Sequence, residues 1–267
     1  MSQDGLAVQR AGAVLSLILD RPEKRNALND ALLSRIGEEL RAAARDTSTH
    51  VLLLRGNGDH FCAGFDLDTV RADELSEDRM RREREQLFEQ ALFLRDLPMP
   101  TVAVVQGACV AAGLLLSQMC DLIIASEDAF FYNPLPRMGG VGLELLLEPW
   151  DMGVRKAKRY LFTGERIPAA AALELGMVTD LAPRERLSED AEALTERIAA
   201  MPPVTLSLLK RSLNRTQDLM GMRDALEYHF AMHHLGHASA ESQRLLHAAR
   251  QGKPLKDYFQ ARDEGTL

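Results

Sequence analysis

The chain has 267 residues, of which 46% are hydrophobic and 27% are charged, and its formal net charge is -7 at pH 7. The apolar share can build one large core or a core with an appendage, which excludes wholesale disorder. The negative charge argues weakly against a nucleic-acid partner, and no hydrophobic run reaches the roughly 18 residues of a membrane span.

Short apolar runs and one helical pattern occupy the start of the chain. β-branched residues and leucines over 13–20 predict a strand. Asn29 or Asp30 then caps a helix to about Ala44, because leucine and isoleucine recur there at helical spacing. The continuous apolar run 51–55 predicts a buried strand.

Residues 75–96 carry many charges of both signs, which predicts an exposed helix with a frayed start. For its basic part, 79–84, a solvated helix face is the default interpretation and a phosphate contact the minority one. The next elements expected are strands at 101–105, 121–125 and 129–132, with a helix over 111–120. Strand, glycine-rich turn, helix and strand thus occur twice before residue 130, which indicates α/β layers.

The chain is mostly helical after about residue 154. Pro168 opens a helix that ends near Gly176, and Pro202-Pro203 opens another with no strand signal up to about residue 252. We therefore expect an α/β core over 1–200 and a helical region over 201–267. Helices attached to a complete core often serve assembly, so we expect an oligomer.

Three histidines of this helical region, His229, His233 and His237, recur at i, i+4 and i+8, which places them on one helix face. Metal binding is conceivable for such a face, but no glutamate completes a His-Glu-x-x-His arrangement. We expect a surface or interface helix and no metal site.

The cysteines and the N-terminus indicate the cellular compartment of the protein. Cys62, Cys109 and Cys120 form an odd set without framework spacing, which predicts reduced thiols that act as small buried hydrophobes. The first twelve residues lack the basic and apolar regions of a secretory signal. We therefore expect a cytoplasmic protein.

Two loops carry the candidate chemistry: HFCAGFDL at 60–67 and QGACVAAG at 106–113. Each follows a predicted buried strand and puts small residues where a turn meets a helix start. Amides there lack partners, so two of them facing one point would stabilise the oxyanion of a thioester enolate. Larger side chains would block the carbonyl. Taken alone, each loop is explained about as well by a tight structural turn.

Further strings accompany these loops. RPEKRNAL at 21–28 resembles the N-terminal signature of the crotonase (enoyl-CoA hydratase/isomerase) superfamily. Five further segments are similar to motifs of this family and occur in the same order: 61–67, 106–113, 119–121, 163–167 and 172–178. The resemblance covers nearly the whole chain. It implies a superhelix of repeated ββα units with a C-terminal helical trimerisation region, a homotrimer or a hexamer made of two trimers, and binding of acyl-coenzyme A.

Carried over position by position, the resemblance implies that the backbone amides of Phe65 and Ala112 form the oxyanion hole. It also implies that two segments line the coenzyme A path, namely Lys24, Arg25 and Ala27 from the first, and Ala63, Asp66 and Leu67 from the second. Coenzyme A enters as part of the substrate, and no separate cofactor is implied.

The chain departs from the hydratases of this family at two positions. Those enzymes carry one glutamate in the helix after the second loop, where this chain has Leu115, and another after a proline, where it has Leu135. Adding water to an enoyl thioester needs a base and an acid, each contributing about 10²–10⁴-fold, and leucine can be neither. We therefore expect ordinary hydration to be negligible unless other residues substitute.

Other polar residues are candidate replacements. Glu144 lies at about the offset where the family's dienoyl isomerases carry a carboxylate, although a glutamate at a helix N-terminus explains it at least as well. Arg137 is a candidate to hold a substrate carboxylate or ketone, or to pair with Glu144. Asp68 is near the pocket mouth in the family register, and a first-turn helix acid is the preferred explanation. Tyr132 and His60 are weaker candidates, as packing or turn residues.

Three functions are open from the sequence. The first is a lyase or isomerase of fatty-acid or related acyl-CoA metabolism that forms an enolate, with isomerisation, decarboxylation and carbon–carbon hydrolysis as possible reactions. The second is a non-catalytic acyl-CoA carrier or sensor, because Leu115 and Leu135 would line an apolar pocket. The third is a hydratase with a relocated acid and base.

Overall fold

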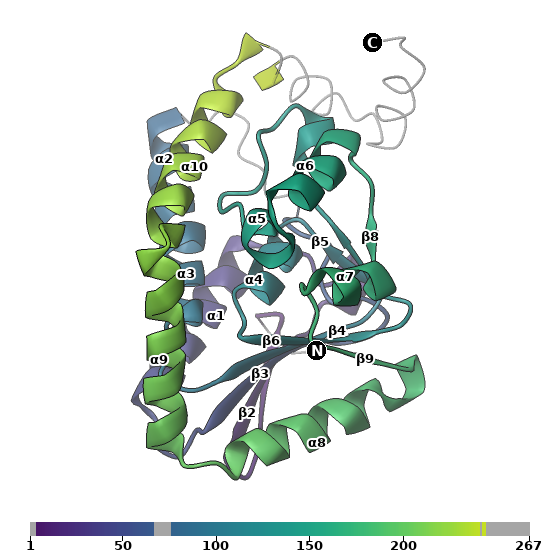
Figure 1. The fold of residues 1–267 in the computed structure, drawn as a ribbon, viewed down its shortest axis with the longest axis vertical. Helices are drawn as coiled ribbons and strands as arrows, with labels where there is room; N and C mark the ends of the chain where they lie inside the picture. Colours follow the sequence, from purple (N-terminus) through teal and green to yellow (C-terminus); the bar gives the residue numbers. More distant parts are fainter. Residues whose placement is uncertain (1–3, 67–75, 241, 244–267) are drawn as a thin grey trace.

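The computed structural model describes residues 4–66, 76–240 and 242–243 (Figure 1). A six-stranded sheet in the order β1-β2-β3-β4-β6-β9 crosses this part of the chain. β1 pairs with β2 in antiparallel register, and the other neighbours are parallel. A smaller sheet has the order β5-β7-β8, in which β5 and β7 are parallel.

The predicted strands are confirmed to within two residues. They are β2 (Val14–Leu19), β3 (Val51–Gly56), β4 (Thr101–Val105), β6 (Leu122–Ser126) and β7 (Phe130–Tyr132). The structure adds β1 (Leu6–Ala11), β5 (Ala108–Val110), β8 (Ile167–Pro168) and β9 (Asp180–Ala182). These additions are sheet-edge strands, two or three residues long except for β1, so their apolar pattern is too brief to identify them.

Side chains of the large sheet alternate between two apolar layers. Leu52, Leu54 and Ala103 face the main core, whereas Val51, Leu53 and Val102 face α8 (Leu187–Ala199). Figure 1 shows α8 running across that second face of the sheet. A strand buried on both faces needs apolar residues at every position, which explains the continuous runs in the sequence.

Helices cover the other face of the sheet. α1 (Asp30–Arg45) is capped by Asn29, whose side chain accepts a hydrogen bond from the Leu32 amide, as predicted. The remaining helices near the core are α4 (Ala112–Gln118), α5 (Glu148–Met152), α6 (Val154–Thr163) and α7 (Ala169–Leu175). Short 3₁₀ turns occur at Pro22–Lys24, Leu135–Met138 and Arg184–Arg186. All three cysteines are free and buried, as predicted.

The charged segment after residue 75 is not the fully exposed helix that its composition suggests. It consists of α2 (Ser76–Glu83), a π-helical turn (Arg84–Phe88) and α3 (Glu89–Arg95). One face is buried, because α9 (Pro203–Leu219) and α10 (Met222–His237) run along it (Figure 1). Phe88 packs on Phe230 of α10, with ring centroids 5.0 Å apart. The exposed-helix prediction is therefore wrong for this face.

Polar contacts fasten α9 to the core. The Lys210 ammonium donates to the Met99 carbonyl (3.0 Å) and pairs with Asp121 (2.7 Å). α8 ends at Ala199 and α9 begins at Pro203, while the division into 1–200 and 201–267 stays a prediction. Within the described ranges, no helix combines the length and apolar character that a membrane crossing requires.

Candidate functional site

The two small-residue loops predicted from the sequence meet at the start of α4. The Cys62 amide donates to the Ala108 carbonyl (3.1 Å), and the Val110 amide donates to the Cys62 carbonyl (2.9 Å). A methyl group placed on Gly64 would lie 2.7 Å from Ala111 Cβ and 3.6 Å from the Ala112 nitrogen. The loop before Phe65 therefore touches the first residues of α4.

The amides of Phe65 and Ala112 are both available at this contact. On either side of Phe65, Leu28 donates to the Gly64 carbonyl and Asp66 donates to the Leu28 carbonyl, each at 2.8 Å. Ala112 is the first residue of α4, where an amide has no acceptor inside the helix. Over the described ranges we find no hydrogen bond from either amide. Two unpaired donors thus lie in neighbouring loops.

Ala111 adopts a backbone conformation that is rare for a residue with a side chain, with φ 51° and ψ -122°. Such conformations cost about 1–3 kcal/mol and persist where the surroundings enforce them. The Ala111 amide donates to the Tyr132 carbonyl (3.0 Å), next to the pairing of β5 with β7. This turn directs the chain into α4 and sets the orientation of Ala112.

The predicted coenzyme A segments lie side by side. The Ala63 amide donates to the Arg25 carbonyl (3.0 Å), so the Lys24–Ala27 stretch runs along the first loop. Lys24 and Arg25 are exposed, whereas Ala27 is buried. The Asp66 carboxylate is 2.7 Å from the Arg21 guanidinium. Leu67 and Asp68, predicted to line the path and its mouth, lie outside the described residues.

The two leucines at the departing positions are packed in the main core. Leu115 is buried in α4, and Leu135 begins the 3₁₀ turn Leu135–Met138 and is partly buried. Near Leu135, the aliphatic part of Arg137 lies against Gly164, where an added methyl group would be 2.5 Å from its Cδ. That these leucines replace catalytic glutamates stays a prediction.

Glu144 is in the loop before α5, four residues ahead of the helix, so the explanation as a helix N-terminal acid is wrong. It is 4% exposed, and its Oε2 has no hydrogen bond among the described residues. Burial raises the pKa of Glu144, while nearby His233 acts in the opposite direction. A buried carboxyl group with a raised pKa is the kind of group that proton transfer uses near neutral pH.

Two histidines of α10 hold the loop that carries Glu144. His229 Nε2 is 2.8 Å from the Leu143 carbonyl, and His233 Nδ1 is 2.9 Å from the Gly142 carbonyl. Both histidines are buried, so the expectation of a surface or interface helix is wrong for them. Helix α10 packs on the 139–147 loop and on α2, two elements distant in sequence.

Glu83 of α2 completes this cluster and was missed from the sequence. Its carboxylate is 3.3 Å from His233 and 3.5 Å from His234, and Arg79 is 2.6 Å from its other oxygen. Burial alone would raise the pKa of Glu83, but His233 and Arg79 lower it to about 2. Burial would lower the pKa of His233, but Glu83 raises it. Because Glu83 lies in a segment rich in charges of both signs, the sequence did not indicate that it is buried.

A second pair of acids, Glu148 and Asp151 of α5, was also missed. Glu148 is buried, and its Oε1 accepts a hydrogen bond from Asn133 (2.8 Å). Asp151 is partly buried and accepts one from Gln118 (2.7 Å). Burial raises the pKa of Glu148, and it raises the pKa of Asp151 to about 7. These carboxyl groups border α4 and the turn before Leu135.

Asp151→Asn is expected to stabilise the protein above pH 7 and to leave its stability unchanged near pH 4. Folded Asp151 keeps its proton up to about pH 7, whereas the unfolded chain releases it near the ordinary value of 3.8, so folding stability falls as pH rises through this window. Because the side chain is only partly buried, we expect a gain of about 1–3 kcal/mol at pH 8. Urea unfolding of both proteins from pH 4 to 8 measures this gain. A difference in the free energy of unfolding that does not change with pH would contradict the raised pKa of Asp151.

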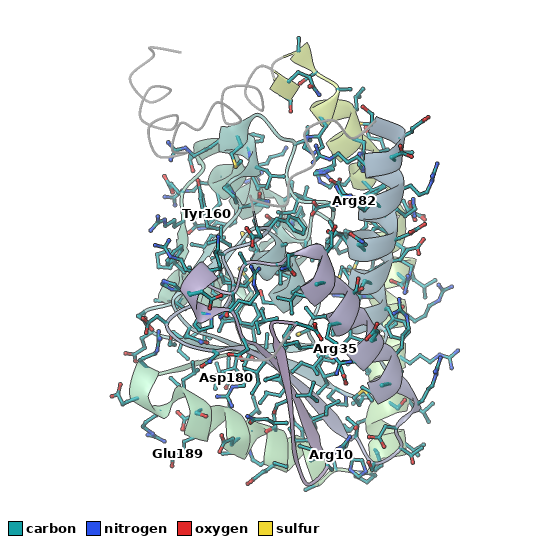
Figure 2. All side chains as sticks on the ribbon, turned by 180° about the vertical axis from the view of Figure 1, so that it is seen from behind. Arg10, Arg35, Arg82, Tyr160, Asp180 and Glu189 are labelled. Carbon is teal, nitrogen blue, oxygen red and sulfur yellow. The ribbon has the colours of Figure 1, made fainter. Side chains whose placement is uncertain are left out.

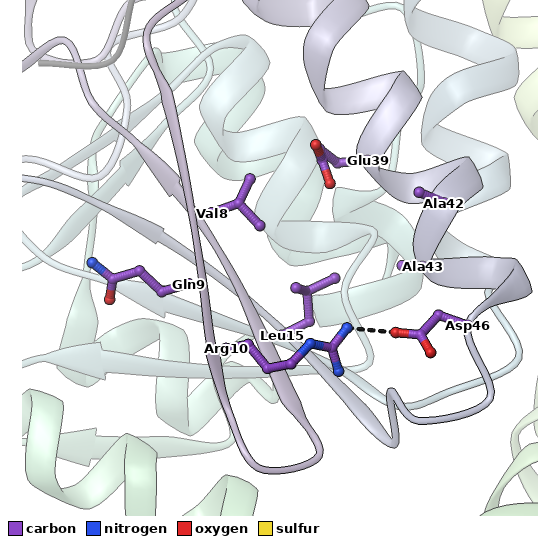
Figure 3. Close-up of a pocket in the computed structure, with 8 residues that line it drawn as sticks. All are labelled: Val8, Gln9, Arg10, Leu15, Glu39, Ala42, Ala43 and Asp46. Atoms are coloured by element: carbon purple, nitrogen blue, oxygen red, sulfur yellow. Dashed lines mark hydrogen bonds and ion pairs between the residues drawn. The ribbon is translucent and has the colours of Figure 1, made fainter.

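Two clefts of the described chain lie elsewhere. One, of about 270 Å³, is between the β1–β2 hairpin and the end of α1, where Arg10 pairs with Asp46 (Figure 3). The other, of about 600 Å³, is beside α9 and includes Lys210. Neither is lined by Phe65, Ala112 or Glu144. The candidate site therefore rests on the meeting of the loops.

Comparisons with known proteins agree on one family. The family model described as enoyl-CoA hydratase/isomerase matches residues 9–255. The chain is 34% identical over 220 residues to the 2,3-dehydroadipyl-CoA hydratase of Escherichia coli K12, covering 80% of this chain and 83% of the relative.

Solved structures are similar along nearly their whole length. A probable enoyl-CoA hydratase from Mycobacterium smegmatis superposes with a TM-score of 0.85 at 38% identity, covering 89% of this chain and 96% of that one. An enoyl-CoA hydratase/isomerase from Xanthobacter autotrophicus Py2 superposes with a TM-score of 0.87 at 31% identity, covering 98% of each chain. The crotonase-like α/β fold with a C-terminal helical region is thereby confirmed, and the chain belongs to the enoyl-CoA hydratase/isomerase family.

Proposed function

We propose that the protein binds an acyl-CoA thioester at the two loops and stabilises its enolate with the backbone amides of Phe65 and Ala112. The observation that carries the proposal is the contact of Gly64 with Ala111 and Ala112, which brings the two unpaired donors together. Preorganised donors of this kind are worth about 10²–10³-fold each when negative charge develops on an oxygen. Family membership supports a thioester as the ligand.

Beside the coenzyme A path, exposed Lys24 and Arg25 supply positive charge. Phosphate groups favour such side chains, so we propose that this strip holds the anionic part of coenzyme A. Arg137 is proposed to act closer to the acyl group, on a substrate carboxylate or ketone. The pairing of Asp66 with Arg21 keeps the first loop in place.

The proposed reaction is not ordinary hydration, because Leu115 and Leu135 offer neither acid nor base. Glu144 is the proposed proton-transfer group, since it is buried and its Oε2 is not engaged by a described hydrogen-bond donor. Reactions that pass through an enolate with one such group are isomerisation, decarboxylation and carbon–carbon hydrolysis.

Mass spectrometry in heavy water tests the proposal. The protein is incubated with enoyl-, dienoyl-, 3-oxo- and saturated acyl-CoA esters, and each ester is examined for deuterium at the α-carbon and for new products. We expect deuterium or a product in at least one class. An unchanged panel, with no ester retained on the protein, would overturn the proposal.

A non-catalytic acyl-CoA carrier is the second candidate function. It is favoured by the packing of Leu115 and Leu135 in one apolar core, which suits a saturated chain. Retention of a saturated long-chain ester on the protein without exchange or turnover would select this function. Failure to retain any ester would exclude it.

We propose further that α9 mediates assembly into a trimer or a hexamer of two trimers. It exposes the large apolar side chains of Val204, Leu208, Leu209, Leu213 and Leu219, and Met220 directly after the helix is exposed too. Contiguous exposed apolar patches mark interaction sites. A second copy of the chain is the proposed partner.

The double variant Leu208→Lys, Leu213→Lys is expected to weaken this assembly at least about 10-fold, because each leucine contributes about 1.5–3 kcal/mol when buried. Light scattering coupled to size exclusion measures the molar mass across a dilution series. Arg211→Gln on the same helix is the matched control and should keep the mass of the unmodified protein. An unmodified protein that is monomeric at high concentration would contradict the proposal.

A further inference from the structure

Glu83, His233 and His234 bring three potential metal-ligand atoms to one point between α2 and α10. The two histidine nitrogens and the carboxylate oxygen all lie within 4.8 Å of one another. Glu83 is 4% exposed, His233 is 1% exposed and His234 is partly exposed, so the point lies just beneath the surface. Figure 1 shows α2 and α10 side by side, and the contact between Glu83 and His233 joins them.

The orientation of His233 leaves one nitrogen directed at this point. Its Nδ1 faces the Gly142 carbonyl at 2.9 Å, and a carbonyl only accepts, so Nδ1 carries the hydrogen. Its Nε2 is directed at the point, 3.3 Å from Glu83 Oε2, where a metal ion would replace the proton that otherwise joins the two groups. Metal-binding histidines are usually oriented in this way, with the second ring nitrogen donating to a carbonyl or carboxylate.

Glu83 and His234 each present an atom without a hydrogen bond. Arg79 Nε is 2.6 Å from Glu83 Oε1, so that oxygen is occupied and Oε2 faces the histidines. His234 Nε2 has no hydrogen-bond partner in the described part of the chain, and Glu83 Oε2 has none beyond its ionic contacts with the two histidines. Burying such polar atoms without a partner is unfavourable unless a ligand satisfies them.

The spacing of these atoms suits a small tetrahedral ion. Zinc bonds of about 2.0–2.2 Å to nitrogen and oxygen place neighbouring ligand atoms about 3.3–3.6 Å apart. Glu83 Oε2 is 3.3 Å from His233 Nε2 and 3.5 Å from His234 Nε2. His237 Nε2 is 3.0 Å from that of His233, but its lone pair accepts from Arg79 at 3.0 Å, so it is not counted among the ligands. Two of the distances between ligand atoms therefore already match those of a tetrahedral zinc site.

We propose that Glu83, His233 and His234 form a binding site for a divalent transition-metal ion of the zinc class. Two imidazoles and one carboxylate favour zinc, cobalt, nickel or copper over magnesium and calcium, which prefer oxygen ligands. Three protein ligands leave a fourth position for water. Through His233 and Gly142 the ion would brace the loop that carries Glu144.

Metal binding to untagged, chelator-treated, full-length protein tests the proposal. We expect one equivalent of Zn²⁺ per chain after equilibrium dialysis. Zn²⁺ should raise the midpoint of thermal unfolding, and Mg²⁺ should leave it unchanged. Co²⁺ in the same site should give the visible absorption band of a four-coordinate ion. Glu83→Gln and His234→Asn should each lower Zn²⁺ affinity at least about 100-fold, because ligand loss exceeds the 10–100-fold effect of outer-shell changes.

Glu227→Gln is the matched control, because it removes one carboxylate charge, as Glu83→Gln does, but at an exposed residue of α10 that pairs with Arg84. It should keep both the stoichiometry and the Co²⁺ band. His234 is partly exposed, so its variant reports on binding even where Glu83→Gln disturbs packing. Absence of stoichiometric Zn²⁺ in the unmodified protein, or unchanged binding in both ligand variants, would overturn the proposal. No acyl-CoA is used, so the result is independent of the proposed enolate chemistry.

Discussion

Replacing Gly64 with alanine is expected to lower the free energy of unfolding by about 2–4 kcal/mol and to slow α-carbon exchange at least about 10²-fold. Gly64 has φ +97°, where an alanine is strained, and the new methyl would lie 2.7 Å from Ala111 Cβ. To relieve this clash, the loop carrying Phe65 must move away from Ala112, which separates the proposed amide donors. Urea unfolding at a fixed protein concentration and heavy-water exchange measure the two effects.

A double-mutant cycle with Ala111→Gly provides the control. That change removes the methyl group that the new side chain would strike and relaxes the positive φ of Ala111. We expect the double variant to recover about 1–2 kcal/mol of the loss, because residues in contact are not additive. Full additivity would show that Gly64 and Ala111 are not in contact, and the proposed oxyanion hole would lose its geometric basis.

Replacing Glu144 with glutamine is expected to reduce α-carbon exchange by about 10²–10⁴-fold, the usual contribution of a proton-transfer group. Its stability at pH 7 should be unchanged or slightly greater, because glutamine has the same shape and burial disfavours the charged form of Glu144. The exchange rate of an ester that the unmodified protein labels, together with urea unfolding, is the measurement. A stable variant with the original rate would remove Glu144 from the mechanism.

Glu148 is the competing group, and the matched variant Glu148→Gln separates the two assignments. It too is buried, with burial raising its pKa, and its Oε1 accepts from Asn133, a bond that glutamine preserves. We expect this variant to keep its exchange rate. Loss of exchange here together with an unchanged Glu144→Gln variant would identify Glu148 as the proton-transfer group.

Several charged side chains lie on helices and strands that also carry buried apolar residues. Figure 2 labels the charged residues Arg10, Arg35 and Glu189, which lie on β1, α1 and α8. Two of these charges lie on amphipathic helices: α1 also carries buried Leu32, Leu33 and Ile36, and α8 carries buried Leu187 and Ala191. An amphipathic pattern of this kind is sufficient to orient a helix on a core.

The sequence by itself determined the central strands, the capped helix α1, the two loops and the helical C-terminal part. β3 and β4 are buried on both faces, so continuous apolar runs identify them. The two loops were predicted for a related reason, because small residues directly after such strands leave amides unpaired, whereas the assignment of Phe65 and Ala112 follows from the family resemblance and stays a prediction. These features depend on neighbours within a few residues along the chain.

Only the tertiary structure decided which distant residues meet. Glu83 and His233 are 150 positions apart, and nothing near Glu83 in the sequence distinguishes it from the solvated charges around it. The same packing of α10 buries the histidines and gives Glu144 its charged neighbours. Burial and charge pairing depend on separation in space, which a local pattern does not encode, so the sequence identified the loops and left the groups around Glu144 to the fold.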